Sequence, residues 1–145
     1  MGKRRRSREF ALQVLYQLDI TRQEGVKAIA QFRDHFSQKE ERDEFAERIV
    51  LGVEGHRQEV DQLIEQYSEN WRLDRMSMID RNILRMAIFE LLYCEDIPPK
   101  VSLNEAIELG KRYGTEDSGS FINGILDRIQ NKVVRKPIQV KSISE

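Results

Sequence analysis

Positive charge is concentrated in the first eight residues of the chain. This stretch holds five basic residues and no acidic one: Lys3, Arg4, Arg5, Arg6 and Arg8. The whole chain has 24 basic and 25 acidic residues, and without these five it has 19 basic residues against the same 25. Guanidinium and ammonium groups bind phosphate oxygens. A cationic terminus on an otherwise acidic chain therefore predicts an RNA-binding segment, with a terminus that only aids solubility as the alternative.

The expected RNA is single-stranded. Side chains of a helical protein cannot read the deep groove of A-form RNA, whereas unpaired bases are free to stack on exposed aromatic side chains. Five cations on phosphates predict a slope of about −3.5 in log affinity against log salt, at roughly 0.7 per contact. Tyr16, beside the apolar stripe of the first predicted helix, is a candidate for stacking, and plain packing is the alternative.

The common sequence motifs of enzymes are absent from this chain. It has no Walker loop, dinucleotide-binding glycine pattern, HExxH or CxxC pair. Neither His35 nor His56 has a second metal ligand four residues away. The acidic residues over 40–47 suit a helix N-terminus, whose dipole they complement, better than a metal site. We therefore expect no enzymatic activity, no cofactor and no metal.

The chain of 145 residues is the length of one domain. Its single cysteine, Cys94, lies in an apolar run and is expected to be a buried thiol. The longest apolar stretch, 86–94, is far shorter than a membrane span, which needs about 18 residues. No signal peptide is visible, so we expect a cytoplasmic protein without a membrane partner.

Helical periodicity predicts an all-α fold. Ala11, Val14, Leu15 and Leu18 form one apolar stripe of a helix over about 5–21. Further helices are expected over 25–37, 45–67, 77–95, 102–113 and from about 117. The helix over 77–95 is apolar nearly all round and is expected at the centre, with Glu90 bonded to backbone or to an arginine such as Arg85.

Glycine, serine and acidic residues predict several local features. Gly52 and Gly55 are expected to permit a close helix crossing inside the helix over 45–67. Ser102 and Glu105 predict a capping box, Gly114 a left-handed helix end, and Asp117 or Ser118 the start of the last helix. Trp71 is expected to pack in a joint over 68–74, and the tail over 137–145 to be flexible.

Four ordered blocks resemble the NusB family of bacterial transcription antitermination factors. They are RRRSREFALQVLY (4–16), ILRMAIFEL (83–91), PPKVSLNEAIELGK (98–111) and YGTEDSGSFINGIL (113–126). The resemblance implies two small helical bundles packed as one NusB-like domain, with subdomains of about 1–70 and 71–136. It also implies binding of single-stranded boxA RNA together with the ribosomal protein NusE, and entry into the RNA polymerase antitermination complex on ribosomal RNA operons.

The resemblance also implies roles for individual residues. It places Tyr16 and Asp80 at the surface that meets RNA and NusE, and the cations from Lys3 to Arg8 on RNA. Asp117 and Phe121 fall at the RNA-facing edge. Periodicity places Phe121 in the core, so these two roles compete.

Other functions stay open at this point. Related helical domains resemble the amino-terminal part of ribosomal RNA cytosine methyltransferases, which need a separate cofactor-binding domain. A helix-turn-helix DNA reader would carry its basic residues on a recognition helix rather than at a terminus. A scaffold would not bind RNA at all. The resemblance permits a monomer or a homodimer.

Overall fold

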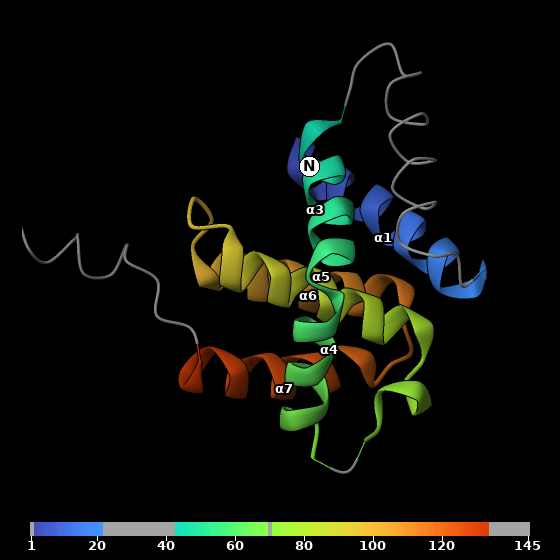
Figure 1. Cartoon of the computed structure of the whole chain (residues 1–145), viewed down its shortest axis with the longest axis vertical. Helices are drawn as coiled ribbons and strands as arrows, with labels where there is room; N and C mark the ends of the chain where they lie inside the picture. The colour runs from blue at the N-terminus through green and yellow to red at the C-terminus, as the bar shows by residue number, and fades with distance from the viewer. Residues whose placement is uncertain (1, 22–42, 70, 134–145) are drawn as a thin grey trace, which may run out of the picture.

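The computed structural model describes residues 2–21, 43–69 and 71–133 (Figure 1). Within these ranges the chain is helical and has no strand, which confirms the all-α prediction. The elements are α1 (Lys3–Thr21), α3 (Glu44–Gly55), α4 (Arg57–Tyr67), the 3-10 helix η1 (Leu73–Arg75), α5 (Met78–Tyr93), α6 (Pro99–Tyr113) and α7 (Ser118–Lys132). The helix expected over 25–37, His35 and the tail over 137–145 lie outside the described residues.

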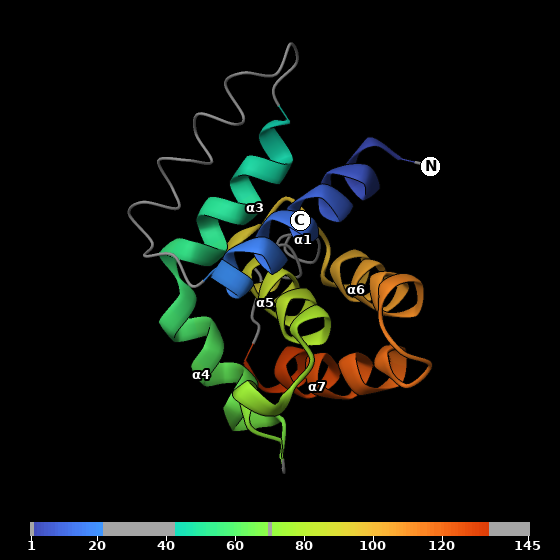
Figure 2. The same ribbon diagram turned by 90° about the vertical axis from the view of Figure 1, so that its right-hand side faces the viewer.

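Helix α5 lies at the centre of the fold, as predicted. It contacts α1, α3, α4, α6 and α7, and Figure 2 shows it surrounded by these helices. Every residue over 82–91 is buried, because neighbours cover α5 on all sides. The apolar stripe predicted for α1 faces this core: Ala11, Val14, Leu15 and Leu18 are all buried. The division into subdomains near residue 70 stays a prediction.

The prediction of a single helix over 45–67 is wrong, because the helix is interrupted at His56. Helix α3 ends at Gly55, and His56 has non-helical dihedrals with φ −119° before α4 begins. Gly52 does permit a close crossing, since a Cβ atom there would lie 2.1 Å from the Phe89 ring. A Cβ atom on Gly55 would meet nothing within 4 Å, so Gly55 belongs to the helix end and not to a crossing.

The prediction for α6 is right about its last residue, Tyr113, and wrong about its start and about the residues that cap it. The helix begins at Pro99, whose ring suits a first turn, and so Ser102 is not its cap. The Ser102 hydroxyl instead donates to Glu90, and Glu105 accepts from Arg5. Gly114 has φ −97° and is extended rather than left-handed; a Cβ atom there would lie 2.2 Å from the Ser118 hydroxyl oxygen. Helix α7 begins at Ser118, within the predicted start.

A buried ionic cluster fixes the far end of α1 to α5. The carboxylate of Asp19 accepts hydrogen bonds from Arg81, Asn82 and Arg85, at distances of 2.8 to 3.1 Å. Burial alone would raise the pKa of Asp19, but these hydrogen bonds and the positive charges hold it at about 2. Arg85 is thus committed to Asp19 and to Asp61 of α4.

Two further predictions are settled by burial and length. Cys94 is a buried free thiol, as expected. In the part of the chain that the structure describes, no helix combines the length and apolar character needed to cross a membrane.

Candidate nucleic-acid interface

The five N-terminal cations lie within helix α1, because the helix begins at Lys3, two residues earlier than predicted. Side chains three or four positions apart share a side of a helix, so the helical twist sends the five cations in different directions. Their environments differ accordingly, and only some of them face solvent.

Arg8 is buried and bound to the central helix. Its guanidinium donates two hydrogen bonds to the carboxylate of Glu90, at 2.8 and 2.7 Å, and the Ser102 hydroxyl donates a third at 2.7 Å. The side chains of Arg8 and Glu90 are 5% and 2% exposed. The arginine partner of Glu90 is therefore Arg8 and not Arg85, because Arg8 faces α5 one turn into α1. In this conformation its guanidinium is not exposed to a phosphate.

Arg5 and Arg4 are paired with acids nearer the surface. Arg5 donates to both carboxylate oxygens of Glu105 on α6, at 3.0 and 2.7 Å, and these hydrogen bonds lower the pKa of Glu105. Arg4 lies over the Phe45 ring at 4.4 Å and reaches Asp96 at 3.4 Å. Both members of the Arg4–Asp96 pair are about half exposed, so the pair is weak and open to exchange.

Lys3 and Arg6 are exposed and form no ion pair with any residue that the structure describes. Together with Arg4 they make up the cations of α1 that are exposed to solvent, and we call these three residues the basic face of α1. The cluster predicted from the sequence thus divides into three accessible cations, the half-buried Arg5 and the buried Arg8.

Tyr16 lies half-buried on the same helix, beside a groove of about 360 Å³. The groove is also lined by Ile79 at the start of α5 and by Tyr113 at the end of α6. Asp80 follows Ile79, and its backbone N–H donates to the Ser77 hydroxyl at 3.0 Å. Its Oδ1 atom is buried and accepts no hydrogen bond from the described residues. Asp80 itself is not among the residues that line the groove.

Asp117 and Phe121 lie together at the start of α7. Asp117 is exposed and its side chain caps no backbone N–H. Phe121 is half-buried and packs against the core, and its ring meets Trp71 edge to face with centroids 6.0 Å apart. The Phe121 side chain therefore contacts the core on one side and remains partly exposed at the surface. Trp71 packs in the joint, as expected, and its partner there is Phe121. Its side chain is nevertheless 51% exposed, which no sequence pattern predicted.

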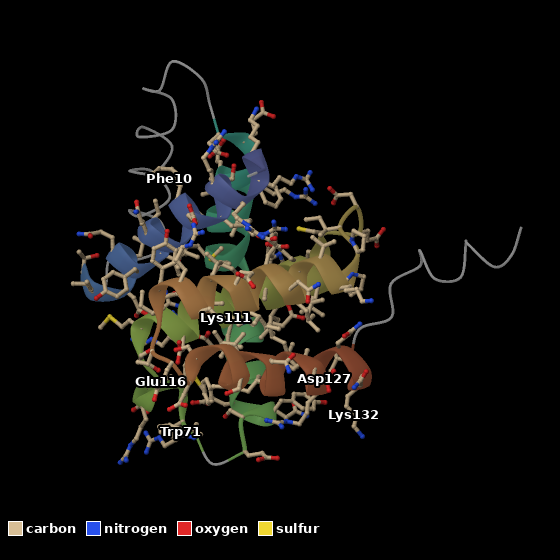
Figure 3. The ribbon with its side chains drawn as sticks, turned by 180° about the vertical axis from the view of Figure 1, so that it is seen from behind. Phe10, Trp71, Lys111, Glu116, Asp127 and Lys132 are labelled. Carbon is tan, nitrogen blue, oxygen red and sulfur yellow. The ribbon has the colours of Figure 1, made fainter. Side chains whose placement is uncertain are left out.

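Side-chain ion pairs link α1 to α6, among them the pair of Arg5 with Glu105. Glu9 of α1 forms an ion pair with Arg112, which precedes Tyr113 on α6. Figure 3 labels Lys111, Glu116 and Trp71 in descending order along the α6–α7 side of the molecule. Sequence analysis did not single out Arg112 or Tyr113, because the ion pair of Arg112 with Glu9 joins residues that are distant in sequence. Trp71 reaches this side of the molecule through its contact with Phe121.

Metal ligands do not gather in the described part of the chain: no three His, Cys, Asp or Glu side chains there are placed to hold one ion. His56 instead stacks on Tyr93, with ring centroids 4.0 Å apart.

Comparisons of the sequence with a family model and with known proteins agree on one family. The NusB family model matches residues 5–131. The transcription antitermination protein NusB of Myxococcus xanthus is 53% identical over 133 residues, covering 89% of this chain and 95% of that protein. The NusB protein of Syntrophus aciditrophicus is 50% identical over 136 residues, covering 94% of this chain and 84% of that protein.

Solved structures agree with the sequence matches. A NusB structure of T. maritima has a TM-score of 0.82 at 38% identity and covers 98% of this chain and 99% of that one. A chain in the crystal structure of the antitermination factors NusB and NusE in complex with dsRNA has a TM-score of 0.73 at 27% identity, covering 90% of this chain and 98% of that one. This chain therefore belongs to the NusB family of transcription antitermination proteins.

Proposed function

We propose that this protein binds single-stranded boxA RNA together with the ribosomal protein NusE and carries both into the RNA polymerase antitermination complex on ribosomal RNA operons. The observation that carries the proposal is the basic face of α1, three exposed cations on a chain with net charge −1. The related structure with NusE and dsRNA supports RNA and NusE as partners. The role is non-catalytic and cytoplasmic.

The charge arrangement favours modest affinity for RNA alone. Lys3 and Arg6 are unpaired among the described residues, and Arg4 must exchange only a weak surface pair to reach a phosphate. Three phosphate contacts give a salt slope of about −2.1, at roughly 0.7 each, instead of the −3.5 expected for five. A second RNA-binding protein at the groove beside Tyr16 would raise the affinity through effective concentration.

The test is a titration of labelled single-stranded boxA RNA with this chain, with and without NusE, over a series of salt concentrations. The double variant Lys3→Ala, Arg6→Ala should bind more weakly and reduce the slope to about −0.7. Lys132→Ala on α7, which removes another exposed cation, is the control and should leave the slope unchanged. Equal slopes for the double variant and the parent would overturn the proposal.

Two comparisons separate this role from its alternatives. Duplex DNA of the same sequence should compete poorly against the single-stranded RNA, whereas a DNA reader would favour the DNA duplex. Added NusE should tighten RNA binding, and an unchanged affinity would remove the joint mode of binding. A homodimer, which the family resemblance permits, stays a prediction for sedimentation analysis.

A further inference from the structure

Trp71 is the only tryptophan of the chain, and half of its surface is exposed to solvent. A tryptophan is usually buried for most of its area, and its burial is among the larger single contributions to a core. Its exposure therefore calls for an explanation. Trp71 lies between α4 and η1, below Glu116 in Figure 3.

The position of Trp71 is fixed by its neighbours. Its backbone N–H donates to the carbonyl oxygen of Ser68 at 3.3 Å, and the buried Ser68 hydroxyl donates back to the Trp71 carbonyl oxygen. Glu69 in the same turn has φ 60°, a left-handed conformation that is unfavourable for a residue with a side chain. These hydrogen bonds fix the backbone of Trp71, and the contact with Phe121 positions its indole.

The contact with Phe121 leaves part of the indole surface uncovered. The two rings are nearly perpendicular, with an interplanar angle of 77°. In such a pair one edge meets one face, so at least one face of the indole is not covered by Phe121. A flat π-system offered to solvent from a fixed turn suits the stacking of an unpaired base.

Two arginines follow Trp71 in the sequence, Arg72 directly and Arg75 within η1. Arg75 is exposed and forms no ion pair within the described ranges. Arg72 is exposed and pairs with Asp74 at 3.2 Å, a surface contact that a phosphate can replace. The other acid in the turn, Glu69, lies 3.8 Å from Arg128 and is thereby partly neutralised. Phosphates on either side of a stacked base would find cations here.

We propose that Trp71 and Phe121 form a platform on which one unpaired base of the RNA stacks, with Arg72 and Arg75 facing the adjoining phosphates. This inference rests on the proposed function, because it assigns a second contact to the same RNA. The strand would run from the basic face of α1, past Arg112 and Tyr113, to the start of α7. Stacking contacts tolerate any base, so this platform adds affinity and not sequence selection.

The single tryptophan makes the test direct. Single-stranded boxA RNA is titrated into the unaltered chain while Trp71 fluorescence and the anisotropy of the labelled RNA are followed together. Stacking should quench the fluorescence, with the same midpoint as the anisotropy change. Unchanged fluorescence on saturation with RNA would overturn the platform and leave the proposed function standing. No anisotropy change at any salt concentration would overturn both.

Variants supply the second readout. Trp71→Ala should weaken RNA binding about tenfold, within the range measured for loss of one stacked base, and Trp71→Phe should retain most of the affinity. Tyr93→Ala is the control, because Tyr93 is also an exposed aromatic but lies at the opposite end of α5. A purely structural tryptophan predicts lower stability with unchanged affinity for Trp71→Ala. Should that variant fail to fold, Trp71→Phe and the fluorescence of the unaltered chain still decide the question.

Discussion

Replacing Arg8 by methionine should lower the free energy of unfolding by several kcal/mol, although the sequence placed Arg8 in the basic cluster expected on RNA. The substitution keeps an unbranched side chain of similar length but leaves the carboxylate of Glu90 buried with only the Ser102 hydroxyl and its remaining neighbours. Breaking a buried ion pair by removing one partner costs about 3 to 5 kcal/mol. Since the free energy of unfolding of a native domain is about 5 to 15 kcal/mol, this loss is a large share of the total stability.

The assay is urea unfolding followed by far-ultraviolet circular dichroism. Arg6→Met, two residues away and exposed, is the matched control and should change the free energy of unfolding by no more than about 0.5 kcal/mol. The double variant Arg8→Met, Glu90→Met removes both charges and should recover most of the stability lost by Arg8→Met alone.

RNA binding gives an independent check on the same residue. At a temperature where Arg8→Met is folded, its salt slope for boxA RNA should equal that of the parent, because the Arg8 guanidinium is not at the surface. A slope smaller by about 0.7 would place Arg8 on a phosphate. That result, or a loss of stability below about 1 kcal/mol, would refute the structural role assigned to this ion pair.

Two further predictions concern stability. The pKa of Asp19 is held at about 2, below its ordinary value of 3.8, so its contribution is present above about pH 4 and is lost as the pH falls toward 2. Asp19→Asn should cost about 2 to 3 kcal/mol at pH 7 and flatten the acid side of a stability profile measured by urea unfolding; a profile like that of the parent would contradict this. Gly52→Ala should destabilise by about 1 to 3 kcal/mol, because the new methyl group meets Phe89 at 2.1 Å, whereas Gly55→Ala should be neutral or slightly stabilising. Equal thermal midpoints for the two glycine variants would disprove the close crossing.

Helix periodicity predicted most of the fold, and the errors occurred at helix ends. The stripes of α1 and α5 are long and regular, and burial of one face or of the whole circumference follows from such patterns. The break at His56 was missed, because the apolar spacing continues from α3 into α4 without interruption. The start of α6 was misplaced since Ser102 and Glu105 match a capping box in sequence, while their side chains bind Glu90 and Arg5 instead.

The sequence by itself determined that this protein is helical and that its positive charge is gathered at the N-terminus, because periodicity and charge are properties of the chain. It also carried the family resemblance that the comparisons confirm. Only the tertiary structure decided which cations are accessible: Glu90 and Glu105 are distant in sequence, and their packing beside α1 withdraws Arg8 completely and Arg5 in part. The exposure of Trp71 was decided in the same way, because residue type sets only a tendency toward burial, and which helices meet decides the outcome at one position.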